Sequence, residues 1–290
     1  MVSSNLDLFN KNGFLLLENC FSEKEIENLR KKIKKISNNN KNTYLLTSLC
    51  FKEKEIYETI FNKRLVEAYN EIIQEEVYLI PELHVQINQF PNNSRSGWHY
   101  DGQSERKNAY LKAINRKFFR VGIYLQDNSL NYGGGIDIIK SDLFKKIPFK
   151  INNLIEKKII NFYSLFFSKT IQSKKGSVVF FDSRLPHKGT YPKKNIYDIN
   201  FQDKYTIYFQ VGNREHCEYF LKNSIERTFQ GYNNINVATY FLDYLKLKFP
   251  SEYPSEFVNM LNLNNINLLT SSDKEANFFK EFEKFTEISK

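Results

Sequence analysis

The chain has 290 residues, of which 41% are hydrophobic, so it is long enough to bury a sizeable core. Its net charge is +9, but no recognised nucleic-acid-binding motif accompanies the lysines, and no apolar run is long enough for a secretory signal or a membrane span. The three cysteines are odd in number and widely spaced, which argues against a disulfide framework and a zinc site. We therefore expect a cytoplasmic protein that binds neither nucleic acid nor membrane.

The chain contains no linker rich in proline, glycine or serine, and no internal repeat. This favours a single domain spanning 1–290. We expect its core to cover about 10–228 and a helical C-terminal extension to cover about 229–290.

The first predicted elements are helices. Ser22 and Glu25 form a capping-box pattern ahead of a helix that runs to about Ile36. A second helical region is predicted from about Ile56 to Ile73, because its apolar residues recur at helical spacing.

The middle of the chain is predicted to form strands. Strands are predicted from Val77 to Phe90, from Phe118 to Asp127 and from Lys204 to Val211. Polar and apolar residues alternate within Glu82–Asn88 of the first strand and along the other two, which gives each strand one polar and one apolar face. Shorter strands are predicted at Ile136–Ile139, Thr170–Gln172 and Ser177–Phe181.

These elements predict an α+β fold with a mainly β core. A polar strand face can line the pocket of an open barrel while helices cover the apolar outside. The helices that precede the strands favour this arrangement over a sheet exposed to water. Further helical segments are predicted at Arg214–Phe229, Val237–Leu247, Glu256–Leu261 and Lys274–Ile288.

The segment SGWHYDGQ places His99 and Asp101 two residues apart, directly after a predicted strand. Alone, the pair is compatible with a surface turn or with part of a metal site. Two histidines and one carboxylate form the facial triad that binds ferrous iron in non-haem oxygenases. His187 follows a second predicted strand, 88 residues after His99, and is the candidate for the second imidazole.

The ordered set of motifs resembles the phytanoyl-CoA dioxygenase family of iron(II)- and 2-oxoglutarate-dependent oxygenases. The segments that carry this resemblance are NGFLLLENCFSEKEIENLRKKI, WHYDG, VGIYLQDNSLNYGGGIDII and KGSVVFFDSRLPHKG. The resemblance implies a double-stranded β-helix, or jelly-roll barrel. It covers the chain to about Glu226.

The resemblance also implies that His99, Asp101 and His187 are the iron ligands and that Fe(II), 2-oxoglutarate and O2 take part in the reaction. The family has a basic residue, normally arginine, that binds the far carboxylate of 2-oxoglutarate. Lys204 stands at the expected place, and Arg120 on a neighbouring strand is the alternative. Gln86 and Thr206 share polar faces with these residues and are further candidates for cosubstrate binding.

The function implied is a dioxygenase that hydroxylates an unactivated C–H bond of a small molecule, with desaturation or oxidative cyclisation as other outcomes. Polar candidate pocket residues suit a polar or anionic substrate. A metal-binding barrel without oxoacid-dependent catalysis and an isomerase of similar shape are the alternatives. A homodimer is compatible with the extra C-terminal helices.

Overall fold

The computed structural model describes residues 4–38, 44–45, 47–88, 97–99, 118–140, 153–182, 185–193, 203–221 and 253–269. Two sheets form its framework. The larger has the strand order β1-β7-β4-β9-β3-β10, with β2 also paired to β3, and the smaller has the order β6-β5-β8. The strands are β1 (Phe14–Leu17), β2 (Tyr44–Leu45), β3 (Val77–Asn88), β4 (Phe118–Tyr124), β5 (Ile136–Ile139), β6 (Ser168–Ile171), β7 (Val178–Phe181), β8 (His187–Gly189), β9 (Lys204–Gly212) and β10 (Ile266–Leu268).

The predicted alternation of strand faces is confirmed for β3, β4 and β9. The apolar sides of these strands belong to the main hydrophobic core, which includes Val85, Val121 and Ile207. Their opposite sides point toward the smaller sheet, because Tyr124 and Tyr208 pack in a second cluster with Ile138 of β5. The larger sheet therefore lies between a helical layer and the smaller sheet.

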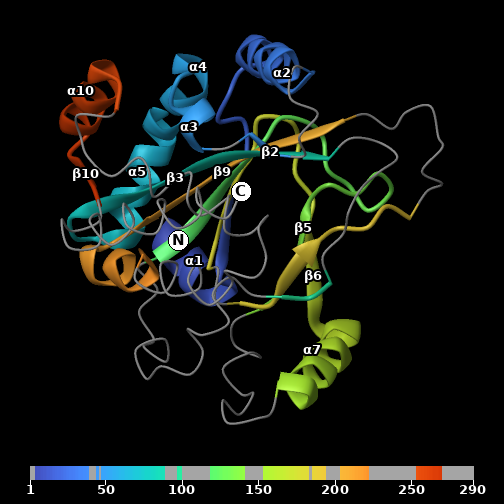
Figure 1. Ribbon diagram of the computed structural model, residues 1–290. Helices are drawn as coiled ribbons and strands as arrows, with labels where there is room; N and C mark the ends of the chain where they lie inside the picture. The colour runs from blue at the N-terminus through green and yellow to red at the C-terminus, as the bar shows by residue number, and fades with distance from the viewer. Residues whose placement is uncertain are drawn as a thin grey trace, which may run out of the picture.

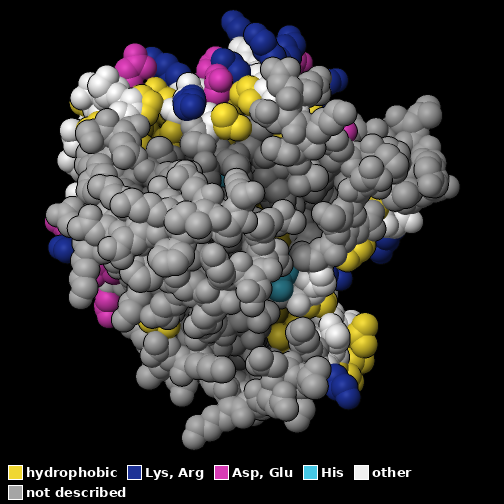
Figure 2. Space-filling model, viewed as in Figure 1, with side chains coloured by type: hydrophobic (Ala, Val, Ile, Leu, Met, Phe, Trp, Pro, Cys, Tyr) yellow, Lys and Arg dark blue, Asp and Glu magenta, His cyan; other side chains and the backbone are white. Residues whose placement is uncertain are grey.

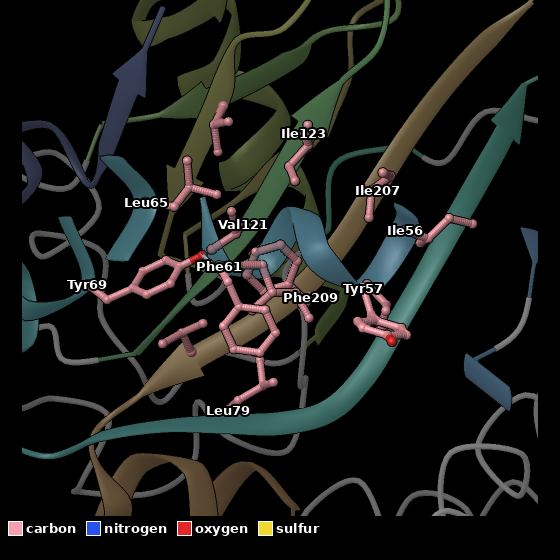
Figure 3. Packing of buried hydrophobic residues seen from close by; sticks show 14 of the residues in the cluster. Ile56, Tyr57, Phe61, Leu65, Tyr69, Leu79, Val121, Ile123, Ile207 and Phe209 are labelled. Carbon is pink, nitrogen blue, oxygen red and sulfur yellow. Dashed lines mark hydrogen bonds between the residues drawn. The ribbon is translucent and has the colours of Figure 1, made fainter. Parts of the chain in front are cut away.

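Helices cover the apolar side of the larger sheet (Figure 1). The helices are α1 (Asn5–Asn12), α2 (Glu23–Asn38), α3 (Thr47–Cys50), α4 (Lys54–Tyr57), the 3-10 helix η1 (Glu58–Phe61), α5 (Lys63–Ile73), α7 (Asn153–Phe167) and α10 (Ser255–Leu263). Figure 3 shows side chains of α5, η1 and α4 packed over strands β4, β9 and β3. Tyr69 is fully buried there, and its hydroxyl donates to the Ile60 carbonyl at 3.0 Å.

Helix α2 begins as the capping box predicts. The Ser22 hydroxyl accepts from the Glu25 backbone at 3.3 Å, while the Glu25 carboxylate accepts from the Ser22 backbone at 2.7 Å. Farther along, the Arg30 guanidinium donates to the carbonyls of Leu125 and Asp203 and lies over the Tyr205 ring. Helix α2 thereby fixes the end of β4 and the start of β9.

The second helical region is divided into three pieces, which differs from the single run predicted from Ile56 to Ile73. Asn62 has an extended backbone, and its side chain caps α5 by accepting from the Arg64 backbone at 3.1 Å. The break separates η1 from α5, so that both pieces place apolar residues on the same sheet.

The C-terminal part of the described chain joins the main core. Strand β10 pairs in parallel with the start of β3. Phe257 of α10 is fully buried, and its ring packs against the rings of Phe51, Tyr57 and Phe61. The predicted helices at Val237–Leu247 and Lys274–Ile288 lie outside the described residues, and the helix predicted from Arg214 is described only over 214–221.

Helix α7 was not predicted from the sequence. It lies between β5 and β6 and projects from the smaller sheet at the edge of the molecule (Figure 1). Among the described helices, none has the length and hydropathy required to cross a bilayer.

Candidate metal centre

The two predicted histidine ligands lie opposite each other in the structure. Strand β7 ends at Phe181, the Leu185 backbone donates to the Asp182 carbonyl, and His187 opens β8. His99 faces His187 across an antiparallel bridge with two backbone hydrogen bonds, of 3.0 and 2.7 Å. The fold thus brings together residues that are far apart in the sequence.

The imidazole rings of this pair are close and similarly held. Their centroids are 4.5 Å apart. Nδ1 of His99 lies 2.9 Å from the Gly97 carbonyl, and Nδ1 of His187 lies 2.8 Å from the Leu185 carbonyl. A carbonyl oxygen only accepts, so each Nδ1 carries the proton and each Nε2 presents a lone pair. This is the tautomer that a metal ion requires from a histidine bound through Nε2.

One histidine of the pair is buried and the other is partly exposed. His187 is only 5% exposed, and its ring meets the edge of the Phe181 ring at a centroid distance of 5.0 Å. His99 is partly exposed. The His99 side of the pair therefore has solvent-accessible surface.

The predicted carboxylate ligand, Asp101, lies outside the described residues. Within the described part of the chain, no group of three histidine, cysteine, aspartate or glutamate side chains is placed to hold a metal ion. The two histidines alone fit an ion that accepts imidazole nitrogens, and they leave further positions for other ligands.

On the polar face of the larger sheet, residues that pair across neighbouring strands form rows. Arg120 of β4 pairs with Phe181 of β7 and with Gln210 of β9. Two residues along, Gly122 pairs with Tyr208, which in turn pairs with His84 of β3. A further row contains Tyr124, Thr206 and Gln86, and a last one contains Lys204 and Asn88.

These rows separate the two candidate oxoacid anchors. Arg120 is in the row of Phe181, whose ring contacts His187. Lys204 is six residues from Gln210 along β9, which corresponds to about 20 Å of extended strand between their α-carbons. Thr206 and Gln86 are in the row next to Lys204. Arg120 is thus in the row that includes Phe181, and the Lys204 α-carbon is three rows farther along the polar face.

Arg120 belongs to a buried polar cluster. Its Nη2 lies 3.3 Å from Oε1 of Glu82, and Oε2 of Glu82 accepts from the Gln210 amide at 2.6 Å. His84 Nδ1 is 3.8 Å from Glu82 Oε1. The Glu82 side chain is 3% exposed, so its negative charge offsets that of Arg120 in a poorly solvated place.

A bulge in β3 positions Glu82. Ile80 pairs with Gln210 and His84 pairs with Tyr208, so residues 81–83 stand opposite Phe209 alone. Pro81 falls in this bulge, where a strand tolerates the missing N–H. The sequence placed Glu82 on the polar face with His84, but it did not identify the carboxylate as the partner of Arg120.

Lys204 is held differently. It is 6% exposed, and its Nζ donates to the Asp127 carbonyl at 2.8 Å. Its side chain passes close to Gly134, where an added Cβ would approach Cδ of Lys204 to 3.0 Å. Burial, together with the nearby positive charge of Arg30, lowers the Lys204 pKa to about 8. Among the described carboxylates, none forms an ion pair with this ammonium group.

Comparisons with known proteins relate this arrangement to solved structures. No family model and no curated protein sequence matches the chain. HygX from Streptomyces hygroscopicus, solved with nickel and 2-oxoglutarate bound, is similar at a TM-score of 0.57 and 14% identity, over 74% of this chain and 87% of HygX. The chain shares the fold of this protein.

Two further structures have the same fold. EctD from S. alaskensis, solved with bound Fe, is similar at a TM-score of 0.52 and 14% identity, over 70% of this chain and 74% of EctD. SnoN, a non-heme alpha-ketoglutarate-dependent epimerase from nogalamycin biosynthesis, is similar at a TM-score of 0.53 and 8% identity, over 71% and 78% of the two chains. At these identities the likeness establishes the fold and not the reaction.

Proposed function

We propose that the protein is an iron(II)- and 2-oxoglutarate-dependent dioxygenase with a double-stranded β-helix core, in which His99, His187 and Asp101 hold the metal. The observation that carries this proposal is the pair of facing imidazoles with both Nδ1 protons fixed on backbone carbonyls. The hydrogen bond at Nδ1 fixes the orientation of each ring, so that Nε2 is directed toward the metal position. The structures of HygX and EctD, which contain a metal in the same fold, support it.

The bound metal would supply oxidation by O2, with 2-oxoglutarate converted to succinate and CO2 and one oxygen atom delivered to a C–H bond of the substrate. The side chains of the protein orient the metal ligands and limit the access of water. The His187 ring is fixed by the Leu185 carbonyl and by the Phe181 edge. The aromatic and aliphatic lining between the two sheets, including Tyr124 and Ile138, restricts the access of water.

We propose that Lys204 binds the distal carboxylate of 2-oxoglutarate. Its ammonium is buried and donates to a neutral carbonyl, so a carboxylate would stabilise its charge. Arg120 is less suited, because Glu82 already offsets its charge and would repel a second carboxylate. Thr206 and Gln86, in the neighbouring row, are placed to contact the same cosubstrate.

We assign the Arg120 end of the polar face to the substrate. Glu82, Arg120, Gln210 and His84 provide hydrogen-bonding groups near His187, and Tyr208 adds an aromatic surface beside His84. This favours a polar small molecule. HygX has been solved with nickel, 2-oxoglutarate and hygromycin B bound, so a protein of this fold can hold a small molecule together with a metal and 2-oxoglutarate. Hydroxylation is the proposed outcome.

The test is an anaerobic titration of the Fe(II) protein with 2-oxoglutarate, followed by visible absorption. A weak charge-transfer band is expected, and it should be absent in His99→Ala and His187→Ala. If iron binds tightly and no band develops, the proposal is wrong and a binding protein or an isomerase becomes the better interpretation.

The same titration tests the anchor. Lys204→Met should weaken 2-oxoglutarate binding much more than the matched variant Arg120→Met. In the wild type, affinity should fall by about tenfold per pH unit above pH 8, because the Lys204 pKa is about 8 and only the ammonium form binds the carboxylate. The opposite ranking of the two variants would assign the anchor to Arg120.

A further inference from the structure

Helix α7 has two apolar sides, of which one is buried. Ile160 is 3% exposed, and Ile159 packs against the cluster between the sheets. The end of the helix is exposed nevertheless. Four of its side chains there, which we call the α7 tip, have exposed fractions of 60% for Phe162, 77% for Leu165, 67% for Phe166 and 42% for Phe167. A helix with a second apolar side open to water is unusual in a globular protein.

The α7 tip is one continuous patch. The Phe162 and Phe166 rings are 5.4 Å apart, and those of Phe166 and Phe167 are 6.2 Å apart. Of the seven large hydrophobic side chains exposed in the described chain, the remaining three are single residues elsewhere. Scattered residues need no explanation, whereas a contiguous group indicates a contact surface.

Positive charge adjoins this patch in the sequence. The stretch from 143 to 176 contains eight lysines and one glutamate, so it carries +7 of the chain's net charge of +9. Lys158 and Lys169 flank the tip and are exposed, and no acidic residue lies between them in the sequence. Figure 2 shows hydrophobic side chains together with Lys or Arg at this corner of the molecule.

We propose that the α7 tip docks on an anionic lipid surface. Phenylalanine and leucine insert into the headgroup region, while adjacent lysines attract negatively charged lipids. Helix α7 lies at the edge of the molecule, so its exposed apolar side can enter a lipid surface without a matching groove (Figure 1). Charge alone would suit nucleic acid as well, but exposed aliphatic and aromatic groups on a helix at the edge of the molecule favour lipid.

The sequence predicted no membrane contact, because no apolar run is long enough for a membrane span. Docking through the α7 tip needs no such run.

The test is flotation of the full-length protein with vesicles of phosphatidylcholine alone and of phosphatidylcholine mixed with phosphatidylglycerol. We expect binding to the mixed vesicles, weakened by added salt. The double variant Phe162→Ser/Phe166→Ser should lower vesicle affinity by about tenfold or more, because each ring contributes buried apolar area. Leu263→Ser is the matched control, since Leu263 is 81% exposed on α10, and it should bind like the wild type.

Several outcomes would overturn the proposal. They are absence of binding to the mixed vesicles, equal binding to both vesicle types, and unchanged binding by the α7 variant. A concentration-dependent dimer that is lost in the α7 variant, without vesicle binding, would identify a second copy of the chain as the occupant. Binding to a single-stranded oligonucleotide in place of vesicles would identify nucleic acid. Circular dichroism of each variant establishes that it is folded.

Discussion

At the scale of single residues, burial of charge decides what the polar face of the sheet can do. Arg120 and Lys204 are both cations on that face, but among the described residues only Arg120 has a buried carboxylate beside it. A buried charge with a partner of opposite sign and one without such a partner affect the free energy of unfolding and ligand binding differently. Both effects can be measured for Arg120 and for Lys204.

Lys204 should make folding depend on pH. Its pKa in the folded protein is about 8, below the ordinary value of 10.5, so the unfolded chain holds more protons between these values. The free energy of unfolding should therefore rise as pH increases from about 8 to 10.5. Below pH 8, Lys204→Met should be more stable than the wild type by about 1–3 kcal/mol. Thermal unfolding at several pH values checks this, and parallel curves for the two proteins would contradict it.

Glu82 and Arg120 should behave as a coupled pair. Glu82→Leu leaves a buried guanidinium without its carboxylate and should cost about 3–5 kcal/mol. The double variant Glu82→Leu/Arg120→Leu should recover most of that loss, because both charges are removed together. Urea unfolding of the two single variants and the double variant measures the coupling, and additive losses would exclude a stabilising pair.

At the scale of elements, some helix boundaries depend on residues that are close in the sequence and others depend on tertiary contacts. The capping box alone starts α2, since its hydrogen bonds join residues only three apart in the sequence. The division of the next helical region depends on Asn62, which caps α5 and also donates to the Cys20 carbonyl at 2.8 Å. That second contact is tertiary, so helical periodicity could not indicate the break.

The contribution of the α2 cap can be isolated. Ser22→Ala removes the side-chain oxygen that accepts from the Glu25 backbone and should lower the free energy of unfolding by about 1 kcal/mol. Lys31→Ala, an exposed position on the same helix, should have almost no effect and serves as the control. Chemical denaturation of both variants gives the comparison, and equal effects would show that the cap is unimportant.

At the scale of the whole molecule, the C-terminal helix α10 and strand β10 complete the core formed by the earlier helices and the sheet. Phe257→Ala should cost about 3–5 kcal/mol, because the large side chain is fully buried among the aromatic rings of three earlier residues. Unfolding should remain a single transition if the C-terminal part belongs to the same cooperative unit. A separate early transition would show that it folds independently, and Leu263→Ala is the exposed control.

The sequence by itself determined the strand faces, the start of α2 and the two candidate histidines, because alternation, capping and strand ends are local features. It did not predict α7, whose exposed apolar side has no distinctive period, or the parallel pairing of β10 with β3. Only the tertiary structure decided that His99 faces His187 and that Glu82 compensates Arg120 but not Lys204. These facts depend on strand register and on a bulge, which bring together residues far apart in the sequence.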